Sequence, residues 1–274
     1  MQITAADVMK LRKMTSAGMM DCKKALAEAE GDFDKAVEII REKGKLVAAK
    51  RADRETTEGA VLVRINGNKA IIMCLGCETD FVSATPDFKN LANSIADAAI
   101  AAFPADIEAL KAVKLNDGYT VEEEISAQTG KTGEKHVLAF YAALEAPYVA
   151  EYVHNNSKLV AIVAFNKEVP TEIGRNVAMQ IASMNPVSVS RNDVPKEIVE
   201  KEFEIARDKA REEGKPEAML DKIAEGRLNK FYKESCLLEQ EFIMDPALTI
   251  EKYLKGVDAD LTVTAFKRVN LNVD

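Results

Sequence analysis

Two short motifs in the 274-residue chain carry residue types that could do chemistry. The first is Cys74-Leu-Gly-Cys77, whose spacing suits a redox pair or one half of a zinc site. A structural zinc site needs four ligands, and the sequence has no second cysteine pair nearby and only two histidines. Because Cys74 also lies inside an apolar run, we interpret the pair as packing residues and predict no metal site. A thiol oxidoreductase that uses Cys74 and Cys77 stays open as an alternative function.

The second motif, Gly130-Lys-Thr132, resembles the end of a phosphate-binding loop. Such a loop also requires a glycine five positions before Gly130, where this chain has Ile125, and an apolar strand leading into it. Neither feature is present. The sequence also lacks the Gly-x-Ser-x-Gly nucleophile motif and the His-Glu-x-x-His zinc motif. We therefore predict no catalytic residues, no cofactor and no nucleotide site in the chain itself.

Composition narrows the class of protein further. The chain is 47% hydrophobic and 30% charged, with a formal net charge of −8, which is typical of a soluble globular protein. A dedicated nucleic-acid-binding surface is usually basic, and no apolar run approaches the roughly 18 residues that cross a bilayer. Four scattered cysteines argue against a secreted disulfide scaffold. We predict a cytoplasmic protein without direct nucleic-acid or membrane partners.

The first 44 residues predict three short helices. Thr4 and Asp7 form a start to the first helix that resembles a capping box. Gly44 is placed to end the third helix. Residues 45–58 are polar and charged, and we interpret them as a linker or an exposed helix.

The middle of the chain contains one structural unit twice. In the first copy, two apolar runs within residues 61–75 flank Asn66-Gly67, which is the strongest short hairpin signal, and a helical stripe follows over 86–103. In the second copy, residues 149–165 hold two strand candidates around a turn at 155–156, and another helix follows. We interpret the two hairpin-plus-helix units as an internal duplication.

The two copies differ in length at one place. Lys69 to Pro86 spans 17 positions, whereas Lys158 to Pro170 spans only 12, so the first copy carries five extra residues between its second strand and its helix. The extra length falls in segment 76–84. Because a loop extended in only one of two copies is not needed by the shared scaffold, we expect function there.

The remaining segments complete an α+β fold with mainly antiparallel sheet. Residues 195–235 carry 10 basic and 11 acidic side chains around a thin apolar stripe, which predicts an inserted helical hairpin or coiled coil. Residues 261–271 alternate like a closing strand. We predict three parts: a helical bundle over 1–55, a first core subdomain over 56–145, and a second over 146–274 that includes the helical hairpin.

Five segments, in order along the chain, resemble the elongation factor Ts family. The first two are long and specific, and together the five cover essentially the whole chain. They are Leu11-Arg-Lys-Met-Thr-Ser-Ala-Gly-Met-Met-Asp-Cys-Lys-Lys-Ala-Leu26, Cys77-Glu-Thr-Asp-Phe-Val82, Ser190-Arg-Asn-Asp-Val-Pro195, Glu225-Gly-Arg-Leu228 and Leu237-Leu-Glu-Gln240. The chain departs from the family pattern at Ser16, at Ser157-Lys158, in Gly133-Glu-Lys-His136 and at Glu241.

The resemblance implies a fold and a function. The fold is a ubiquitin-associated-like bundle followed by two related core subdomains and a coiled-coil insertion. The function is guanine-nucleotide exchange on the GTPase elongation factor Tu, without covalent chemistry, and with GDP and GTP bound by the partner only. The extended loop of Thr79, Asp80, Phe81 and Val82 would act on the partner: Phe81 as a wedge between helices, and Asp80 as a disturbance of the Mg²⁺ site.

The resemblance also implies a second set of contacts. Arg12, Met19 and Met20, with the two methionines just ahead of the second helix, would meet a helix of the GTPase domain. His154 matches a position that faces another domain of the partner.

Plainer interpretations of these residues stay open at this point. Phe81 could be a core residue, because most phenylalanines are buried. Met19 and Met20 could cover the core of the bundle, and Arg12 and His154 could be ordinary structural residues. The bundle alone, over 1–55, could also be a binding module for ubiquitin or the ribosome, as ubiquitin-associated domains are elsewhere.

Overall fold

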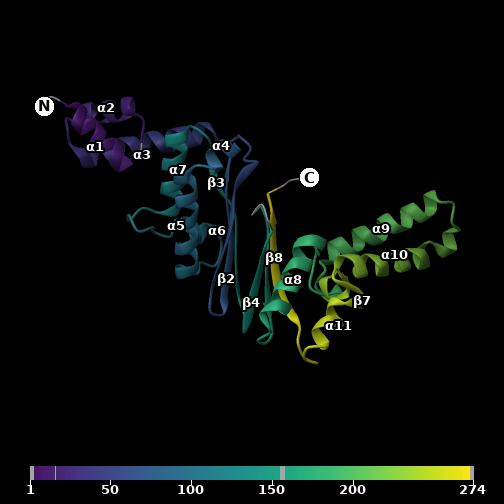
Figure 1. Ribbon diagram of the computed structural model, residues 1–274. Coiled ribbons are helices and arrows are strands. Elements are labelled where there is room, and N and C mark those ends of the chain that lie inside the picture. The colour runs from purple at the N-terminus through teal and green to yellow at the C-terminus, as the bar shows by residue number, and fades with distance from the viewer. Residues whose placement is uncertain (1–2, 16, 155–157, 272–274) are drawn as a thin grey trace.

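The computed structural model describes residues 3–15, 17–154 and 158–271, and it is α+β as predicted. Two three-stranded antiparallel sheets, ordered β1-β2-β3 and β4-β5-β8, pack face to face in the middle of the molecule (Figure 1). Helices cover the outer face of each sheet. A three-helix bundle lies at one end, and a helical hairpin projects from the other side of the core.

The helices are α1 (Ala5–Thr15), α2 (Met19–Glu28), α3 (Phe33–Lys50), α4 (Asp80–Ser83), α5 (Pro86–Ala102), α6 (Ile107–Lys111), α7 (Val121–Thr132), α8 (Thr171–Met184), α9 (Lys196–Glu212), α10 (Leu220–Ser235) and α11 (Ile250–Lys255). The strands are β1 (Glu58–Asn66), β2 (Lys69–Cys77), β3 (His136–Glu145), β4 (Tyr148–Val153), β5 (Leu159–Phe165), β6 (Glu241–Phe242), β7 (Asp245–Thr249) and β8 (Val263–Asn270). Among the described residues, no helix has both the length and the apolar composition that a bilayer span requires.

The first predicted hairpin is present, but its two turn residues are Gly67 and Asn68, one position after the predicted Asn66-Gly67. β1 and β2 pair antiparallel from Glu58 with Cys77 to Asn66 with Lys69. Gly67 takes a φ of 59°, the left-handed conformation that a tight hairpin turn requires and that glycine adopts without steric cost. β2 is the central strand, and all but its first residue are buried because both faces of the sheet are covered.

The second unit repeats this arrangement, which supports the predicted duplication. β4 pairs with β5, β5 pairs with the closing strand β8, and α8 covers the outer face of this sheet. The predicted turn at 155–156 lies outside the described residues. Apolar side chains from both sheets, among them Val61, Ile72, Val160 and Ile162, form the layer between them.

The sequence analysis predicted neither β3 nor the short strands β6 and β7, and it also missed helices α6, α7 and α11. β3 completes the first sheet by pairing with β2, and α6 and α7 join α5 over its outer face. β3 carries no turn signal that ties it to β2, because its partner lies about 70 residues earlier in the chain.

The bundle begins as predicted. The backbone N–H of Asp7 donates to Thr4 Oγ1 (3.2 Å), and the N–H of Thr4 donates to Asp7 Oδ2 (3.0 Å), which completes a capping box. The two methionines differ slightly from expectation. Met19 and Met20 are not ahead of the second helix but are the first two residues of α2.

The prediction that Gly44 ends the third helix is wrong. α3 continues to Lys50, and Gly44 is buried where α3 crosses α7. A Cβ at Gly130 of α7 would lie only 2.5 Å from the Gly44 Cα, so both positions need glycine for the two helices to approach this closely. The glycine pair therefore serves helix packing, and it joins the bundle to the core.

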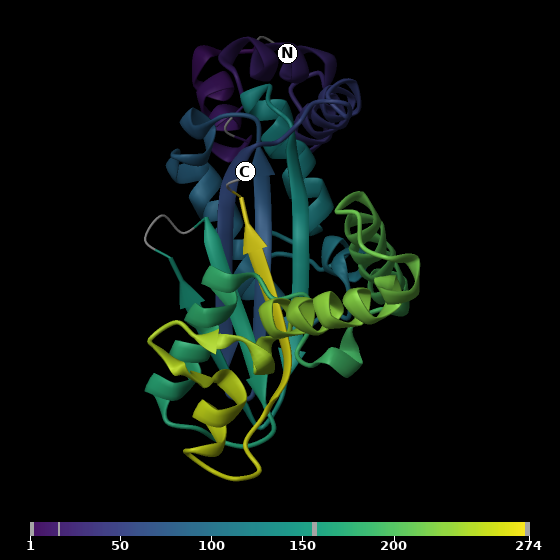
Figure 2. The ribbon, with the colours of Figure 1, turned by 90° about the vertical axis from the view of Figure 1, so that its right-hand side faces the viewer.

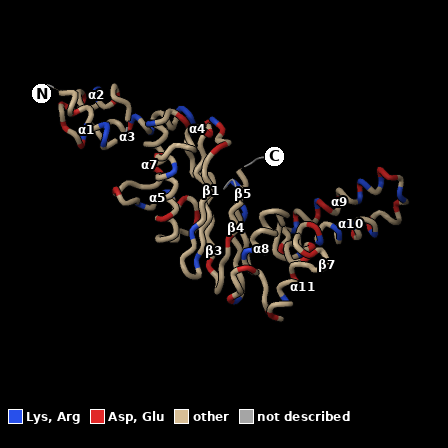
Figure 3. The backbone as a smooth tube through the Cα atoms, viewed as in Figure 1, with Lys and Arg blue, Asp and Glu red and all other residues tan. Residues whose placement is uncertain are grey.

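The inserted hairpin consists of α9 and α10, which pack against one another and project from the second sheet (Figure 2). Acidic and basic residues alternate along both helices (Figure 3). Ion pairs between the helices, such as Arg207 with Asp221 (3.0 Å) and Arg227 with Glu213 (2.7 Å), lie at the surface. The buried residues of these helices are few and mostly alanine, as the thin stripe predicted.

Candidate functional site: an exposed phenylalanine loop

The extra residues of the first unit form a one-turn helix at the end of β2. We call residues 79–84 the Phe81 loop. Its backbone is closed by the N–H of Ser83 donating to the Thr79 carbonyl (3.2 Å) and the N–H of Ala84 donating to the Asp80 carbonyl (2.9 Å). α5 begins directly after it, with Thr85 as its N-cap and Pro86 in its first turn. The loop is therefore held between a buried strand and a long helix.

The apolar side chains of the loop point in different directions. Val82 packs against the buried cluster that contains Phe88 and Ile95. Phe81 is 82% exposed, and Asp80 beside it is also exposed. The interpretation of Phe81 as a core residue is therefore wrong. A large aromatic side chain that stands in water in the free protein suits burial against a partner.

A carboxylate fixes the loop against the end of α3. Arg51 Nη1 donates to both oxygens of Glu78 (3.0 and 3.1 Å), and the backbone N–H of Lys135 donates to Glu78 Oε1 (2.6 Å). The Lys135 N–H, followed by the Arg51 guanidinium, lowers the pKa of Glu78. Lys135 Nζ in turn donates to the carbonyls of Ala52 (2.6 Å) and Arg54 (2.8 Å). These bonds link residues 51–54, which follow α3, to Glu78, which precedes the Phe81 loop, and to Lys135.

The predicted bundle contacts also lie at the surface. Met19 is 43% exposed, Met20 is 63% exposed, and Arg12 is exposed on α1. None of the three belongs to the buried cluster of the bundle, so the interpretation of the methionines as core cover is wrong. Met9 and Met14 of α1, which the sequence reading did not single out, are 64% and 55% exposed. Exposed thioethers adapt their shape to a docked surface.

One hollow borders both regions. Met9, Lys10, Arg12 and Lys13 of α1 face Asp87 of α5 and Lys131 of α7 across an open hollow of about 830 Å³. Asp87 lies in the first turn of α5, three positions after the Phe81 loop ends. The hollow thus has Arg12 on one side and the first turn of α5, which follows the loop, on the other. The fold does not bring His154 there, because His154 follows β4 in the second sheet, where its Nδ1 lies 3.1 Å from the Tyr152 hydroxyl.

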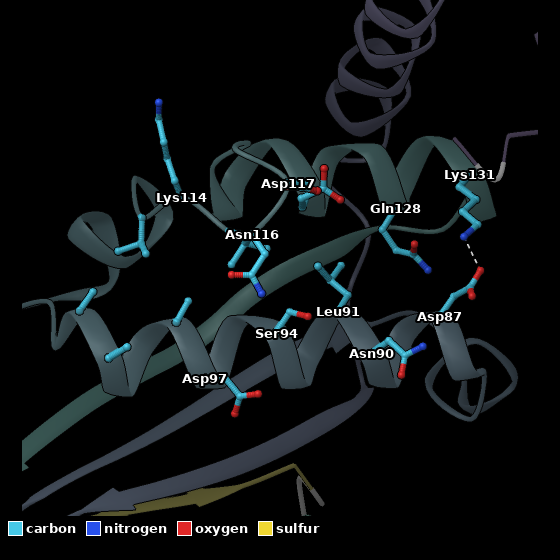
Figure 4. A pocket seen from close by; sticks show the side chains of 16 residues that line it. Asp87, Asn90, Leu91, Ser94, Asp97, Lys114, Asn116, Asp117, Gln128 and Lys131 are labelled. Carbon is cyan, nitrogen blue, oxygen red and sulfur yellow. Dashed lines mark hydrogen bonds and ion pairs between the residues drawn. The ribbon is translucent and has the colours of Figure 1, made fainter. Parts of the chain in front are cut away.

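A second hollow, of about 640 Å³, lies between α5 and α7 (Figure 4). Its lining mixes amides, carboxylates and lysines, and Lys131 is paired with Asp87 at one end. Gly130 and Lys131 stand in the last turn of α7, where carbonyls point outward, whereas a phosphate-binding loop precedes a helix and offers N–H groups. Within the described residues, no three His, Cys, Asp or Glu side chains gather as metal ligands would.

The cysteine pair does not form a redox site. Cys74 faces the layer between the sheets, whereas Cys77 faces the cluster beneath α5, so the two thiols lie on opposite faces of β2. Both side chains are fully buried, and burial raises the pKa of each thiol to about 12. A buried thiol with such a high pKa is almost entirely protonated at neutral pH and is therefore a poor nucleophile.

Sequence reasoning missed the residues that hold the loop. Glu78 lies within the family-like segment Cys77–Val82, which drew attention to it. Its partners Arg51 and Lys135 lie 27 and 57 positions away in the sequence. The pairing of β2 with β3 places Lys135 beside Glu78, and Arg51 reaches Glu78 from the C-terminal end of α3. No local sequence pattern indicates either contact.

The fold and the site define a class: an α+β protein of two facing sheets, with a helical bundle at one end, a projecting helical hairpin, and its most exposed aromatic side chain on a one-turn helix. The chain belongs to the elongation factor Ts family. The family model described as Elongation factor TS matches residues 78–272.

Curated relatives agree over the full length. A protein named Elongation factor Ts from Azobacteroides pseudotrichonymphae genomovar. CFP2 is 51% identical over 275 residues, covering 100% of both chains. Proteins of the same name from Porphyromonas gingivalis strain ATCC 33277 and from Bacteroides fragilis strain NCTC 9343 are 48% and 41% identical, again over 100% of both chains.

Proposed function

We propose that this protein is a guanine-nucleotide exchange factor for elongation factor Tu and acts in translation elongation in the cytoplasm. Family membership supports the partner and the reaction. The observation that carries the proposal is the exposure of Phe81 on a loop anchored by Val82, directly beside exposed Asp80. The protein makes and breaks no covalent bond and needs no cofactor, since GDP and GTP are bound by the partner.

The mechanism follows from differential affinity. A GTPase holds GDP through backbone N–H groups around the phosphates and through a bridging Mg²⁺. An exchange factor accelerates release only if it binds the nucleotide-free form better than the GDP-bound form. By reciprocity, GDP weakens binding of the factor by the same ratio by which the factor weakens binding of GDP.

The Phe81 loop supplies the interaction that differs between the two states. Phe81 enters between helices of the GTPase domain and is buried only in the complex. Asp80 approaches the Mg²⁺ site, where its carboxylate competes for the cation or repels the phosphates. Thr79 and Val82 hold the loop in shape: Val82 is partly buried against the core cluster, whereas Phe81 is exposed.

The bundle supplies the interaction that is common to both states. Arg12, Met19 and Met20 dock on a helix of the GTPase domain, where thioethers bury apolar area without demanding one exact shape. His154 contacts a second domain of the partner from the other sheet. Because α3 is bonded to the Phe81 loop through Glu78, docking of the bundle also places the loop.

The test is stopped-flow release of a fluorescent GDP analogue from elongation factor Tu at increasing concentrations of this protein. We expect the release rate to rise with concentration and then to level off. Asp80→Asn should lower the plateau, whereas the matched control Asp260→Asn, an exposed aspartate between α11 and β8, should leave it unchanged. Release that stays at the spontaneous rate with folded protein would refute the proposal.

A further inference from the structure

The Phe81 loop is positioned by a carboxylate from outside it. Thr79 is the N-cap residue of α4, yet its hydroxyl makes no cap to the helix. It donates instead to Glu134 Oε1 (2.7 Å), while the Thr79 backbone N–H donates to Glu134 Oε2 (3.1 Å). Glu134 thus receives both donors of the one residue that starts the loop. It lies 55 positions away, between α7 and β3.

The surroundings of Glu134 favour a fixed geometry. The Glu134 backbone N–H donates to Thr132 Oγ1 (3.2 Å), and its carbonyl lies 2.9 Å from His136 Nδ1. His136 is buried and packs against Phe88, just beneath the loop. Burial lowers the pKa of His136, so its ring is a neutral and constant partner at neutral pH. The Glu134 backbone is therefore held from the core side, and its carboxylate reaches Thr79.

Lys135, the residue after Glu134, holds the end of α3 in a similar way. Lys135 donates its backbone N–H to Glu78 and its ammonium to the carbonyls of Ala52 and Arg54. Two consecutive residues, Glu134 and Lys135, therefore fix the start of the Phe81 loop and the end of the helix that carries the bundle. One short segment sets the spacing between the two proposed contact regions.

We infer that Glu134 is a positioning residue of the exchange reaction: it touches neither nucleotide nor GTPase, and it acts by holding Thr79 so that Phe81 and Asp80 are presented in the competent geometry. This inference rests on the proposed function. A loop that is fixed before docking avoids the entropy of ordering it during the reaction. Loss of Glu134 thus lowers the rate of the release step and leaves docking of the bundle intact.

Three substitutions separate positioning from charge. Glu134→Gln keeps the shape, and its amide can accept from the Thr79 N–H and donate to the Thr79 hydroxyl. Glu134→Asp keeps the charge, but its reach is shorter by one methylene, about 1.5 Å of bond length. Glu134→Ala removes both. Glu145→Ala is the matched control, because Glu145 accepts from the Asn68 side chain at the opposite end of the same sheet.

The first measurement is stimulated GDP release as a function of protein concentration. We expect Glu134→Ala and Glu134→Asp to lower the plateau rate by about fivefold to tenfold, the effect of losing one or two hydrogen bonds in the competent state. The concentration for half-maximal rate should change by less than about twofold, because the bundle contacts remain. Glu134→Gln and Glu145→Ala should behave like the unsubstituted protein. If Glu134→Asp keeps the plateau while Glu134→Gln loses it, charge rather than positioning matters, and the inference is overturned.

The second measurement needs no partner, and it separates failure of this inference from failure of the proposed function. Amide hydrogen exchange in the free protein should be faster at Ser83 and Ala84 in Glu134→Ala and Glu134→Asp, with α5 unchanged. Equal protection in all variants would overturn the positioning role even if exchange activity is present. Conversely, lost protection without any stimulated GDP release by the unsubstituted protein would leave the positioning of the loop standing and refute the exchange function.

Discussion

Replacing Phe81 with alanine should slow nucleotide release strongly while hardly changing stability. The side chain is 82% exposed, so its truncation removes little buried apolar surface from the folded protein. Exposed substitutions of this kind change the free energy of unfolding by about 0.5 kcal/mol or less. The Phe81 side chain contributes free energy only when a partner buries it. The substitution should therefore affect nucleotide release and not the stability of the free protein.

The size of the functional effect can be worked out from exposure. Burying a phenylalanine side chain fully contributes about 1.5–3 kcal/mol. With 82% of the residue exposed in the free protein, about 1.2–2.5 kcal/mol of this is gained only on docking. At about 1.4 kcal/mol per factor of ten, release at a fixed, limiting concentration should slow by about sevenfold to sixtyfold. Phe81→Leu keeps much of the apolar area, so its release rate should lie between those of the unsubstituted protein and Phe81→Ala.

The assay is stopped-flow release of a fluorescent GDP analogue from elongation factor Tu, with thermal unfolding of each variant measured alongside. Val257→Ala is the matched control, because Val257 is 43% exposed and follows α11, which lies on the opposite side of the core from the bundle (Figure 1). An unchanged release rate for a folded Phe81→Ala variant would refute the wedge. An equal slowing by Val257→Ala would show that any lost apolar area has this effect, and the assignment to Phe81 would fail.

Three further predictions concern the scaffold. Gly130→Ala should lower the free energy of unfolding by about 1–3 kcal/mol, because its Cβ meets the backbone of Gly44. Gly226→Ala, in α10 with open space around it, should be neutral or slightly stabilising, and thermal unfolding of the pair compares them directly. Cys74 and Cys77 should resist alkylation at pH 8 until the protein is unfolded, since thiols with a pKa near 12 are about one part in ten thousand thiolate; rapid labelling of the native protein would contradict their burial. His136 has a folded pKa below its unfolded value because of burial, so the unfolded state takes up the proton first, and stability should fall as the pH drops below about 6.5, at no more than about 1.4 kcal/mol per pH unit. His136→Asn should reduce the difference in free energy of unfolding between pH 7.5 and pH 5.5, as measured by urea unfolding. An equal difference in both proteins would contradict the role of His136.

Much of the scaffold was predictable because its signals are local. Asn66-Gly67 between two apolar runs specifies a hairpin, since the turn needs a left-handed residue that glycine provides. Thr4 with Asp7 specifies a helix start, because their side chains and backbone N–H groups lie within one turn. The five extra residues that pointed to the Phe81 loop were also visible, since the second copy serves as an internal reference.

What escaped the sequence depends on partners far along the chain. Gly44 carries the local signal of a helix end, but α3 continues because α7 covers that position, and glycine there allows the two helices to touch. The strand over 136–145 is fixed by its ladder with β2 and not by its own composition.

The sequence by itself determined the start of the bundle, the two hairpin-plus-helix units, the extended loop and the family, because each depends on residues close together in the chain or on matched segments. Only the tertiary structure decided that Phe81 stands in water while Val82 is anchored, and that Cys74 and Cys77 face opposite sides of one strand. Only the fold brings Glu134 to Thr79 across 55 positions. Exposure and long-range hydrogen bonds are properties of packed neighbours, and a linear pattern does not encode which neighbours those are.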